Sequence, residues 1–352
     1  MKPKRPEGVQ QVGGQPVTLR DVAQAAGVHT ATASRALNPK ARQLVNAETV
    51  RRVMRAAETL GYQPNPIARS LKTSKSATVG LVIPDLTNPL FPPIVRGIEN
   101  VLESAGFSAL IVNTDNDPER ERALIESLRS RQVEGLIVAT ARLEHPFLRQ
   151  LREQDVKIVL INRRIENLQM PFVVGDDATG IALAVKHLVD LGHSRIAHIA
   201  GPQITSTGLD RSRAFRHAVR DYGAEEDPAL IVESAHWSEG DGAGAMRELL
   251  DRGSRCTAVV AGNDLIALGC YDVFAERDIA CPEDVSVVGF NDMPFLDKLR
   301  PPLTTVGVPH HELGAEAARM LLDCIEEPQR HPRSLLLPVS LVLRDSTAPP
   351  RT

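Results

Sequence analysis

Aromatic side chains and long apolar runs are scarce in this 352-residue sequence. Phe, Trp and Tyr make up 3% of the residues, with a single tryptophan, so aliphatic side chains must fill the core. No apolar run approaches the roughly 18 residues of a membrane-spanning helix. The first 16 residues are polar and lack the apolar stretch of a signal peptide. We therefore expect a protein that stays in the cytoplasm and does not enter the membrane.

Paired cysteines and nucleotide-binding loops are also missing. The four cysteines are scattered without a C-x-x-C pair, which predicts reduced, buried thiols rather than a disulfide framework or a zinc ribbon: Cys256, Cys270, Cys281 and Cys324. There is no Walker loop and no G-x-G-x-x-G motif. The segment 192–196 lacks the second small residue of a nucleophile elbow and no triad follows, so we expect a turn from a helix into a strand. His310 and His311 have no accompanying ligand cluster and are expected to begin a helix. We expect no metal, no cofactor and no enzymatic activity.

Charge of one sign is concentrated in one part of the chain. The net charge is −3, but residues 1–75 hold 13 Lys and Arg against 4 Asp and Glu, a net of +9, and the remainder carries −12. A basic head on an acidic body predicts that the head meets a polyanion. A basic segment alone is also compatible with a solvated face or a disordered tail, so the motifs within it must decide.

The basic head contains the pattern of short helices. Thr18 with Asp21 three residues later predicts a capping box at the start of the first helix. Gly27 breaks that helix, and a second is expected over Thr30–Leu37. Asn46 predicts the cap of a third helix that ends at Gly61. The inward faces are expected to comprise Leu19, Val22, Ala23, Ala26, Ala33, Ala36, Leu37, Val50, Val53, Met54, Ala57 and Leu60.

Two helices joined by a glycine turn are typical of a helix-turn-helix, whose second helix lies in the DNA major groove. Arginine reads guanine, and serine and threonine bond phosphates or bases. Small helical bundles with glycine turns are common, so the pattern alone leaves an ordinary bundle open. The polar side of the expected second helix carries Thr30, Ala31, Thr32, Ser34, Arg35 and Asn38.

From Thr78 onward, short aliphatic runs alternate with amphipathic helical patterns, for instance Glu119–Ser130. This alternation predicts parallel, doubly wound α/β sheets, and its recurrence after Asp177 predicts two lobes with a cleft between them. Ligands bind such sheets at the carboxyl ends of the strands. The expected strands are 79–83, 109–112, 135–138, 158–161, 196–200, 258–261, 285–288, 334–337 and 341–344.

The motifs together resemble the LacI/GalR (lactose/galactose repressor) family of bacterial transcriptional regulators. The likeness extends from about residue 17 to 345, in the family's order. It is carried by residues 17–38, 48–62, 64–72, 83–91, 191–197, 288–292 and 302–306. The resemblance implies a small all-α helix-turn-helix headpiece followed by an α/β, two-lobed sensor domain of the periplasmic-binding-protein type.

The resemblance also implies roles in DNA binding. Thr30 and Ala31 match the pair that most sets operator choice, and Arg35 matches a base-contacting arginine. Leu71 matches a hinge-helix leucine that wedges into the minor groove, as apolar side chains of DNA-bending proteins do; taken alone, it could equally pack on the sensor. His29 departs from the family's usual small hydroxyl residue, and Ala31 offers only a methyl contact. The expected DNA-binding residues are Thr18, Thr30, Ala31, Thr32, Ser34, Arg35, Asn38, Asn65, Ala68 and Leu71.

Ligand-binding positions follow from the resemblance in the same way. Arg211 matches the family's ligand-clamping arginine, whose donors suit sugar hydroxyls or a carboxylate. Trp237 matches a ring that stacks on ligand, and Phe91 an apolar wall; core packing remains open for both. Asn162 and Asn291 stand where relatives often place Asp, which could mean altered ligand chemistry. The expected ligand-binding residues are Phe91, Asn162, Arg211, Trp237, Asn263 and Asn291.

These features predict a homodimeric transcriptional regulator, in the mode of a repressor, that binds a near-palindromic operator in double-stranded DNA. A small metabolite, of which a sugar is favoured, is expected to bind between the lobes and act allosterically. The expected segments are an N-terminal arm (1–16), the helix-turn-helix (17–63), a hinge helix and linker (64–75), a sensor (76–345) and a tail (346–352). One sensor lobe is expected to combine 76–176 with 308–336, and the other 177–307 with 337–345.

Two other classes of protein share parts of this pattern. The sensor half alone would suit a transport or chemosensory binding protein, but the headpiece and the missing signal peptide argue against that class. An enzyme could use the same α/β scaffold, since fold does not give function, but no catalytic constellation appears. Neither the identity of the effector, nor its sign as inducer or corepressor, nor the operator sequence follows from the residues.

Overall fold

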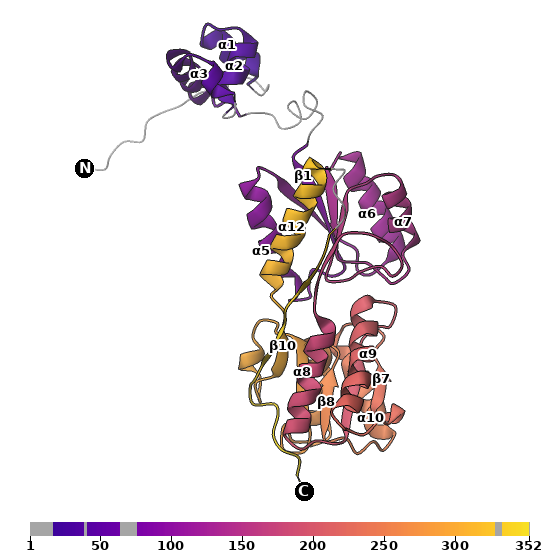
Figure 1. Ribbon diagram of the computed structural model, residues 1–352. Helices are drawn as coiled ribbons and strands as arrows, with labels where there is room; N and C mark the ends of the chain where they lie inside the picture. The colour runs from indigo at the N-terminus through magenta and orange to yellow at the C-terminus, as the bar shows by residue number, and fades with distance from the viewer. Residues whose placement is uncertain (1–16, 39–40, 64–75, 328–332, 352) are drawn as a thin grey trace, which may run out of the picture. The chain divides into compact units, whose positions relative to one another are not determined.

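The computed structural model describes residues 17–38, 41–63, 76–327 and 333–351. The chain divides into two compact units, Met1–Ser76 and Ala77–Thr352 (Figure 1). The expected N-terminal arm and the expected hinge helix lie outside the described residues. Among the described residues, the helices are all too short or too polar to cross a bilayer.

The first unit is a bundle of short helices around a small core. Its elements are α1 (Leu19–Ala25), α2 (Thr30–Leu37), the 3₁₀ turn η1 (Arg42–Leu44) and α3 (Ala47–Leu60). Alanine supplies most of the buried side chains, which lets the helices approach closely. The core comprises Val22, Ala23, Ala26, Ala33, Ala36, Val53 and Ala57.

The helix ends of the first unit follow the expected signals. The Thr18 hydroxyl caps α1, and the Thr18 amide donates to the Asp21 carboxylate at 2.8 Å, completing the capping box. Asn46 accepts from the Glu48 amide at 2.8 Å and caps α3. Gly27 and Gly61 have φ angles of +61° and +65°, a region that glycine adopts without steric cost. The capping box, the cap of α3 and both glycine turns are thereby confirmed, as are the bounds of α2.

Two residues of the expected inward stripe were assigned wrongly, and η1 was not expected. Met54 is 41% exposed and Leu60 37% exposed. Val53 and Ala57, one helical turn apart, take the buried face of α3, so Met54 points about 100° away from it. There its sulfur accepts from Arg42 Nη2 at 3.7 Å. Leu60 is the last residue of α3.

The second unit contains two six-stranded sheets, and the first of them is parallel throughout. Its strand order is β11 (Ser334–Leu337), β5 (Phe172–Gly175), β4 (Ile158–Ile161), β3 (Gly135–Val138), β1 (Thr78–Ile83) and β2 (Ser108–Asn113). Successive side chains of a strand point to opposite faces. One face therefore packs on α5 (Phe91–Ser104) and α12 (His310–Glu326), and the other on α6 (Pro118–Ser130) and α7 (Pro146–Glu153).

The second sheet repeats this plan with one antiparallel edge. Its order is β12 (Ser340–Val342), β10 (Thr304–Gly307), β9 (Ser286–Asn291), β8 (Ala258–Ala261), β6 (Ile196–Ala200) and β7 (Ile231–Glu233), and β12 alone of these strands runs antiparallel to its neighbour. One face packs on α8 (Asp177–Asp190) and α9 (Ser206–Asp221). The other packs on α10 (Glu239–Asp251) and α11 (Asp264–Glu276). Two 3₁₀ turns, η2 (Pro228–Leu230) and η3 (Leu296–Lys298), lie in its loops.

The chain passes between the two sheets three times. It leaves the first after β5, returns to it from β10 through α12, and leaves again between β11 and β12. Each sheet with its helices, called a lobe below, is therefore built from separate stretches of sequence. The two doubly wound sheets and the nine expected strands are confirmed. The last of these strands spans 340–342 rather than 341–344, and the one expected at 285 begins at Ser286.

Three strands were not expected from the sequence: β5, β7 and β10. β10 follows two prolines and begins with Thr304 and Thr305, so it lacks an aliphatic run. β7 has only three residues. Other local expectations hold: α12 begins at His310, and Gly192, with φ +98°, turns α8 toward β6.

The C-terminal segment expected to be a tail is fixed to the second sheet. Ser346 is fully buried, and its hydroxyl donates to the Val287 carbonyl at 2.6 Å and accepts from the Thr304 amide at 2.8 Å. The Ala348 amide donates to Ser286 Oγ at 3.0 Å. The segment thus satisfies polar groups at the amino-terminal ends of β9 and β10.

The expectation of buried thiols is right for two cysteines. Cys256 and Cys270 are buried, and burial raises the pKa of the Cys256 thiol to about 11. Cys281 and Cys324 are only half-buried. Because a thiolate is the reactive form, Cys256 is held in its inert state.

Candidate functional site

The polar side of α2 faces solvent. Ala31, Arg35 and Asn38 are exposed, and Thr30, Thr32 and Ser34 are half-buried, while Ala33 and Ala36 are turned into the core. The structure therefore places the six polar-side residues on α2 and its C-cap, Asn38. Of the other expected DNA contacts, Thr18 lies at the start of α1, and Asn65, Ala68 and Leu71 lie outside the described residues.

His29 caps α2. Its Nδ1 accepts a hydrogen bond from the Ala31 amide at 3.2 Å, as a side-chain oxygen does at an ordinary N-cap. The departure noted at His29 therefore has a structural explanation, because the imidazole does the capping that a small hydroxyl residue would do. The Thr18 hydroxyl is also engaged, since it donates to the Asp21 carboxylate at 2.7 Å.

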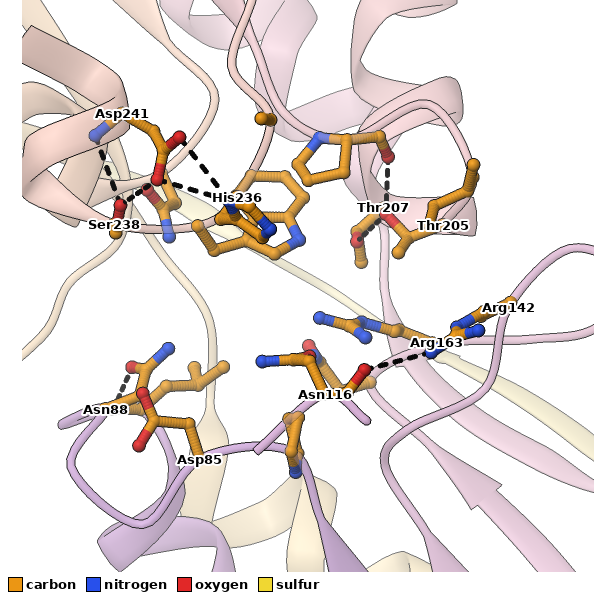
Figure 2. Close-up of a pocket in the computed structure, with 18 of the residues that line it drawn as sticks. Asp85, Asn88, Asn116, Arg142, Arg163, Thr205, Thr207, His236, Ser238 and Asp241 are labelled. Carbon is orange, nitrogen blue, oxygen red and sulfur yellow. Dashed lines mark hydrogen bonds and ion pairs between the residues drawn. The ribbon is translucent and has the colours of Figure 1, made fainter. Parts of the chain in front are cut away.

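A cavity of about 650 Å³ opens in the second unit, between the carboxyl-terminal ends of the strands of the two lobes (Figure 2). This volume lies within the usual range for small-molecule sites. We call it the cleft. All six expected ligand-binding residues line it: Phe91, Asn162, Arg211, Trp237, Asn263 and Asn291.

Arg211 is buried on α9 and already partly engaged. Its Nε donates to Asp177 Oδ1 at 2.8 Å, and its Nη1 donates to the Gly262 carbonyl at 2.7 Å. Its Cζ lies 3.7 Å from the centroid of the Phe290 ring. Burial raises the pKa of Asp177, and the Arg211 cation opposes that rise. Because a guanidinium has five N–H donors, Arg211 retains donors for a ligand after these bonds.

The three cleft asparagines are constrained by the backbone. The Asn263 side-chain oxygen accepts from the Ile266 amide at 2.9 Å and caps α11, which leaves its NH₂ group for the cleft. Asn162 follows β4 directly and Asn291 ends β9, with φ angles of +65° and +122°. Asparagine tolerates positive φ better than most residues. Backbone geometry is therefore a reason for these two amides that is independent of ligand chemistry.

Trp237 and Phe91 combine packing with lining of the cleft. The indole lies against Gly201, where an added Cβ would come within 2.0 Å of the ring. The indole Nε1 is buried and has no hydrogen-bond partner among the described residues. Phe91 is 2% exposed and belongs to the core that the first sheet forms with α5 and α12. Both residues therefore belong to a core cluster and to the cleft wall.

Most of the charged lining was not expected from the sequence. Arg142 and Arg163 follow β3 and β4, Asp85 follows β1, and Thr205 and Thr207 begin α9. His236, Ser238 and Asp241 complete the second-lobe wall (Figure 2). Arg142, Arg163 and Asp85 could have been expected in the cleft, because ligands bind at the carboxyl ends of parallel strands.

The two lobes touch beside the cleft. Arg164 Nη2 donates to both carboxylate oxygens of Asp210, at 2.9 and 2.8 Å, and its amide donates to Ser206 Oγ at 3.0 Å. The Leu143 amide donates to the Ile204 carbonyl at 2.9 Å. Arg164 and Leu143 belong to the first lobe and their partners to the second, so these bonds hold the lobes in the observed arrangement.

Comparison with protein families gives two matches along the chain. Residues 18–65 match the model of the bacterial regulatory proteins of the lacI family, and residues 185–347 match a periplasmic binding protein-like domain. The ribose operon repressor of Halalkalibacterium halodurans is 34% identical over 94% of this chain and 97% of its own length. The transcriptional repressor CytR of Escherichia coli is 34% identical over 94% and 96%.

Solved structures agree with these relatives. The lac repressor dimer bound to operator and an anti-inducer superposes with a TM-score of 0.84 at 28% identity, covering 95% of this chain and all of that one. The regulator CelR in complex with cellobiose gives 0.73 at 32%, covering 94% and 99%. A regulator from Enterococcus faecium with bound ribose gives 0.68 at 32%, covering 77% and 99%.

Proposed function

This chain belongs to the LacI family of bacterial regulatory proteins, and from that premise we propose how it reads DNA and senses its effector. It is a DNA-binding transcriptional repressor under the control of a small molecule. The proposal is that two copies form a homodimer, that each places α2 in the major groove of one half of a near-palindromic operator, and that a sugar in the cleft changes the affinity for that operator.

The observation that carries the DNA-binding part is the exposed polar side of α2. Ala31 near its start and Arg35 in its second half are exposed, and the buried alanines fix which side faces outward. An arginine on a recognition helix reads guanine O6 and N7 with two hydrogen bonds. A dimer is proposed because two-fold symmetry doubles the contacts and matches the symmetry of a palindromic site.

Affinity for DNA is expected to fall steeply with salt. Each phosphate neutralised by the basic unit contributes about −0.9 to the slope of log affinity against log salt concentration. An operator selected from random duplexes by the full-length protein should therefore lose affinity by about 10³-fold or more between 50 and 200 mM salt if about six phosphates are contacted. Fluorescence anisotropy measures this. A slope near zero would contradict the proposal.

A matched variant separates sequence reading from charge. Arg35→Ala should weaken binding to the selected operator by about tenfold or more beyond its effect on random DNA, because a bidentate base contact is worth about 1–3 kcal/mol. Arg51→Ala, at an exposed position of α3, is the control for loss of one positive charge. Equal effects of the two variants on selected and random DNA would exclude Arg35 as a base reader.

A sugar is proposed as effector because the cleft combines flat apolar surface with many hydrogen-bonding groups. Trp237 and Phe91 offer the apolar surface, and the asparagine amides, hydroxyls and Arg211 offer polar contacts. The relatives bound to ribose and cellobiose support the same class. A thermal-shift screen of sugars tests it, since a ligand that binds only the folded state raises the melting temperature.

Control of the operator by the cleft requires that the effector favour one arrangement of the lobes over another. The Arg164–Asp210 pair stabilises the observed arrangement, in which the two walls of the cleft face each other. Both side chains are partly exposed, at 30% and 26%, so the pair is worth only about 0.2–1 kcal/mol. Operator and effector affinities are coupled reciprocally.

Asp210→Asn is therefore expected to weaken effector binding by up to about 5-fold and to change operator affinity in the absence of effector. Isothermal calorimetry and anisotropy measure the two effects. Glu226→Gln is the control, because it breaks the exposed Arg220–Glu226 pair within the second lobe. If both variants behave alike, the interlobe pair has no part in the coupling.

A further inference from the structure

Arg163 is a buried cation whose hydrogen-bonding groups are not used by the fold. The side chain is 6% exposed and lines the cleft. Its Nε is buried without a hydrogen-bond partner, and within the described part of the chain Arg163 takes part in no hydrogen bond or ion pair. Figure 2 shows the guanidinium extending into the cleft between Thr205 and Thr207 on one side and Asn116 on the other.

The charges around Arg163 do not neutralise it. Desolvation and then the nearby cations of Arg142 and Arg211 lower the pKa of Arg163 to about 10. The buried anions on this side are already engaged. Asp177 pairs with Arg211, and Glu121 accepts from the Thr140 hydroxyl and lies 3.4 Å from His145 Nε2. Arg142 donates to the Asn116 carbonyl at 3.0 Å, so of the three guanidiniums Arg163 is the one without a hydrogen-bond or ion-pair partner in the described part of the chain.

The aspartates that also line the cleft are tied to their own loops. Asp85 accepts from the amide and hydroxyl of Thr87, Asp117 caps α6, and Asp115 pairs with Arg120 at 2.6 Å. Asp241 accepts from the Ser238 hydroxyl. Among the described residues, the buried polar atoms of the cleft lining without a partner are both donors, Arg163 Nε and Trp237 Nε1. Leaving a buried donor without an acceptor costs about 1–3 kcal/mol of stability. A ligand rich in hydrogen-bond acceptors would remove that cost.

We propose that the effector is an acidic sugar, whose carboxylate or phosphate group binds to Arg163. This inference rests on the proposed function and names the chemical class of ligand for its site. Carboxylates and phosphates are acceptors only and match the planar fork of a guanidinium. Arg142 stands beside Arg163 as a second cation, and Trp237 covers the uncharged part of the ligand.

The arrangement also predicts rejection of neutral sugars. A neutral analogue leaves the Arg163 cation buried and without an anion, and sites built around such groups discriminate strongly against ligands that fail to pair with them. Losing one charge-assisted hydrogen bond of about 1.5–3 kcal/mol corresponds to roughly 10- to 150-fold in affinity. The neutral member of a matched pair should bind at least tenfold more weakly.

The first experiment uses inorganic anions and the full-length protein. Melting temperatures are measured with sulfate, phosphate and chloride at constant ionic strength, for the wild type, Arg163→Gln and Arg213→Gln. Arg213 is an exposed arginine of α9 and does not line the cleft. We expect saturable stabilisation by sulfate and phosphate in the wild type and in Arg213→Gln, and its loss in Arg163→Gln. Equal stabilisation of all three proteins would overturn the proposal.

The second experiment distinguishes the two sources of negative charge. Calorimetry compares glucose with glucuronate and glucose 6-phosphate, galactose with galacturonate, and ribose with ribose 5-phosphate. We expect an acidic member to bind at least tenfold more tightly than its neutral counterpart, with that preference lost in Arg163→Gln. A neutral sugar that binds more tightly than its acids, equally in wild type and Arg163→Gln, would overturn the proposal.

Operator binding separates this inference from the proposed function. If a neutral sugar releases or strengthens operator binding equally in wild type and Arg163→Gln, the regulator is confirmed and the acidic ligand is wrong. If an acidic sugar binds through Arg163 but leaves operator affinity unchanged, the anion site is confirmed and the allosteric function is wrong. Both readings come from one anisotropy titration with and without the sugar.

Discussion

Arg211→Ala should weaken effector binding by roughly 10- to 150-fold, the equivalent of one lost charge-assisted hydrogen bond of about 1.5–3 kcal/mol. Arg211 keeps donors facing the cleft after bonding Asp177 and Gly262, so the effector would lose its partner on α9. In a gel-shift titration the variant should respond to effector only at raised concentrations. The same titration assigns the effector as inducer or corepressor.

Arg211→Ala should also destabilise the fold. Asp177 would stay buried without its cation, and removing one partner of a buried pair costs about 3–5 kcal/mol. Chemical unfolding should show that loss in Arg211→Ala and a smaller one in Arg211→Ala combined with Asp177→Asn. The double variant should fold well and still need raised effector concentrations to respond. Recovery of the response together with stability would show that Arg211 acts only through the fold.

Gly314→Ala should destabilise the second unit by about 3 kcal/mol or more, at the upper end of what overpacking costs. An added Cβ would lie 2.0 Å from the Ile94 carbonyl oxygen and 2.9 Å from its carbon. The facing Gly97 has the same constraint, 2.0 Å from the His311 carbonyl. Because these neighbours are backbone atoms of α5 and α12, the helices must separate. Urea unfolding followed by circular dichroism measures the change.

Gly244→Ala is the matched control for the glycine prediction. Gly244 lies inside α10 and an added Cβ would meet no atom within 4 Å. Alanine should therefore stabilise by about 0.5–1 kcal/mol through helix propensity. Opposite signs for the two substitutions are the expected result. A neutral Gly314→Ala would mean that α5 and α12 can shift apart without cost.

Much of the fold could be predicted because buried parallel strands appear in the sequence as short runs of aliphatic residues. The strand at 135–138 is an example, since all four residues are apolar or glycine and all are buried. β10 breaks this rule. Thr304 and Thr305 are fully buried, and the hydroxyl of Thr305 donates to Asp264 at 2.5 Å. Asp264 lies 41 residues before Thr305 in the sequence, so no local sequence pattern predicts β10.

The cleft was predictable by position and only partly by chemistry. Residues matched through the family resemblance all line it, but Arg163 was missed because an arginine after a strand looks like an ordinary solvated loop residue. Its burial depends on α9 and on the loops around Asn116, which the sequence does not place together. The roles of Asn263 as a cap and of Asn162 at positive φ also depend on backbone geometry that appears only in three dimensions.

Three passages of the chain between the lobes restrict how they can move. A single connection would let one lobe rotate about three axes relative to the other. Three connections oppose twisting, so that bending about one hinge axis is the motion of lowest energy. A ligand that closes the cleft then drives one reproducible displacement, and its binding energy is not spread over many directions. The same passages mean that neither lobe is a contiguous gene fragment.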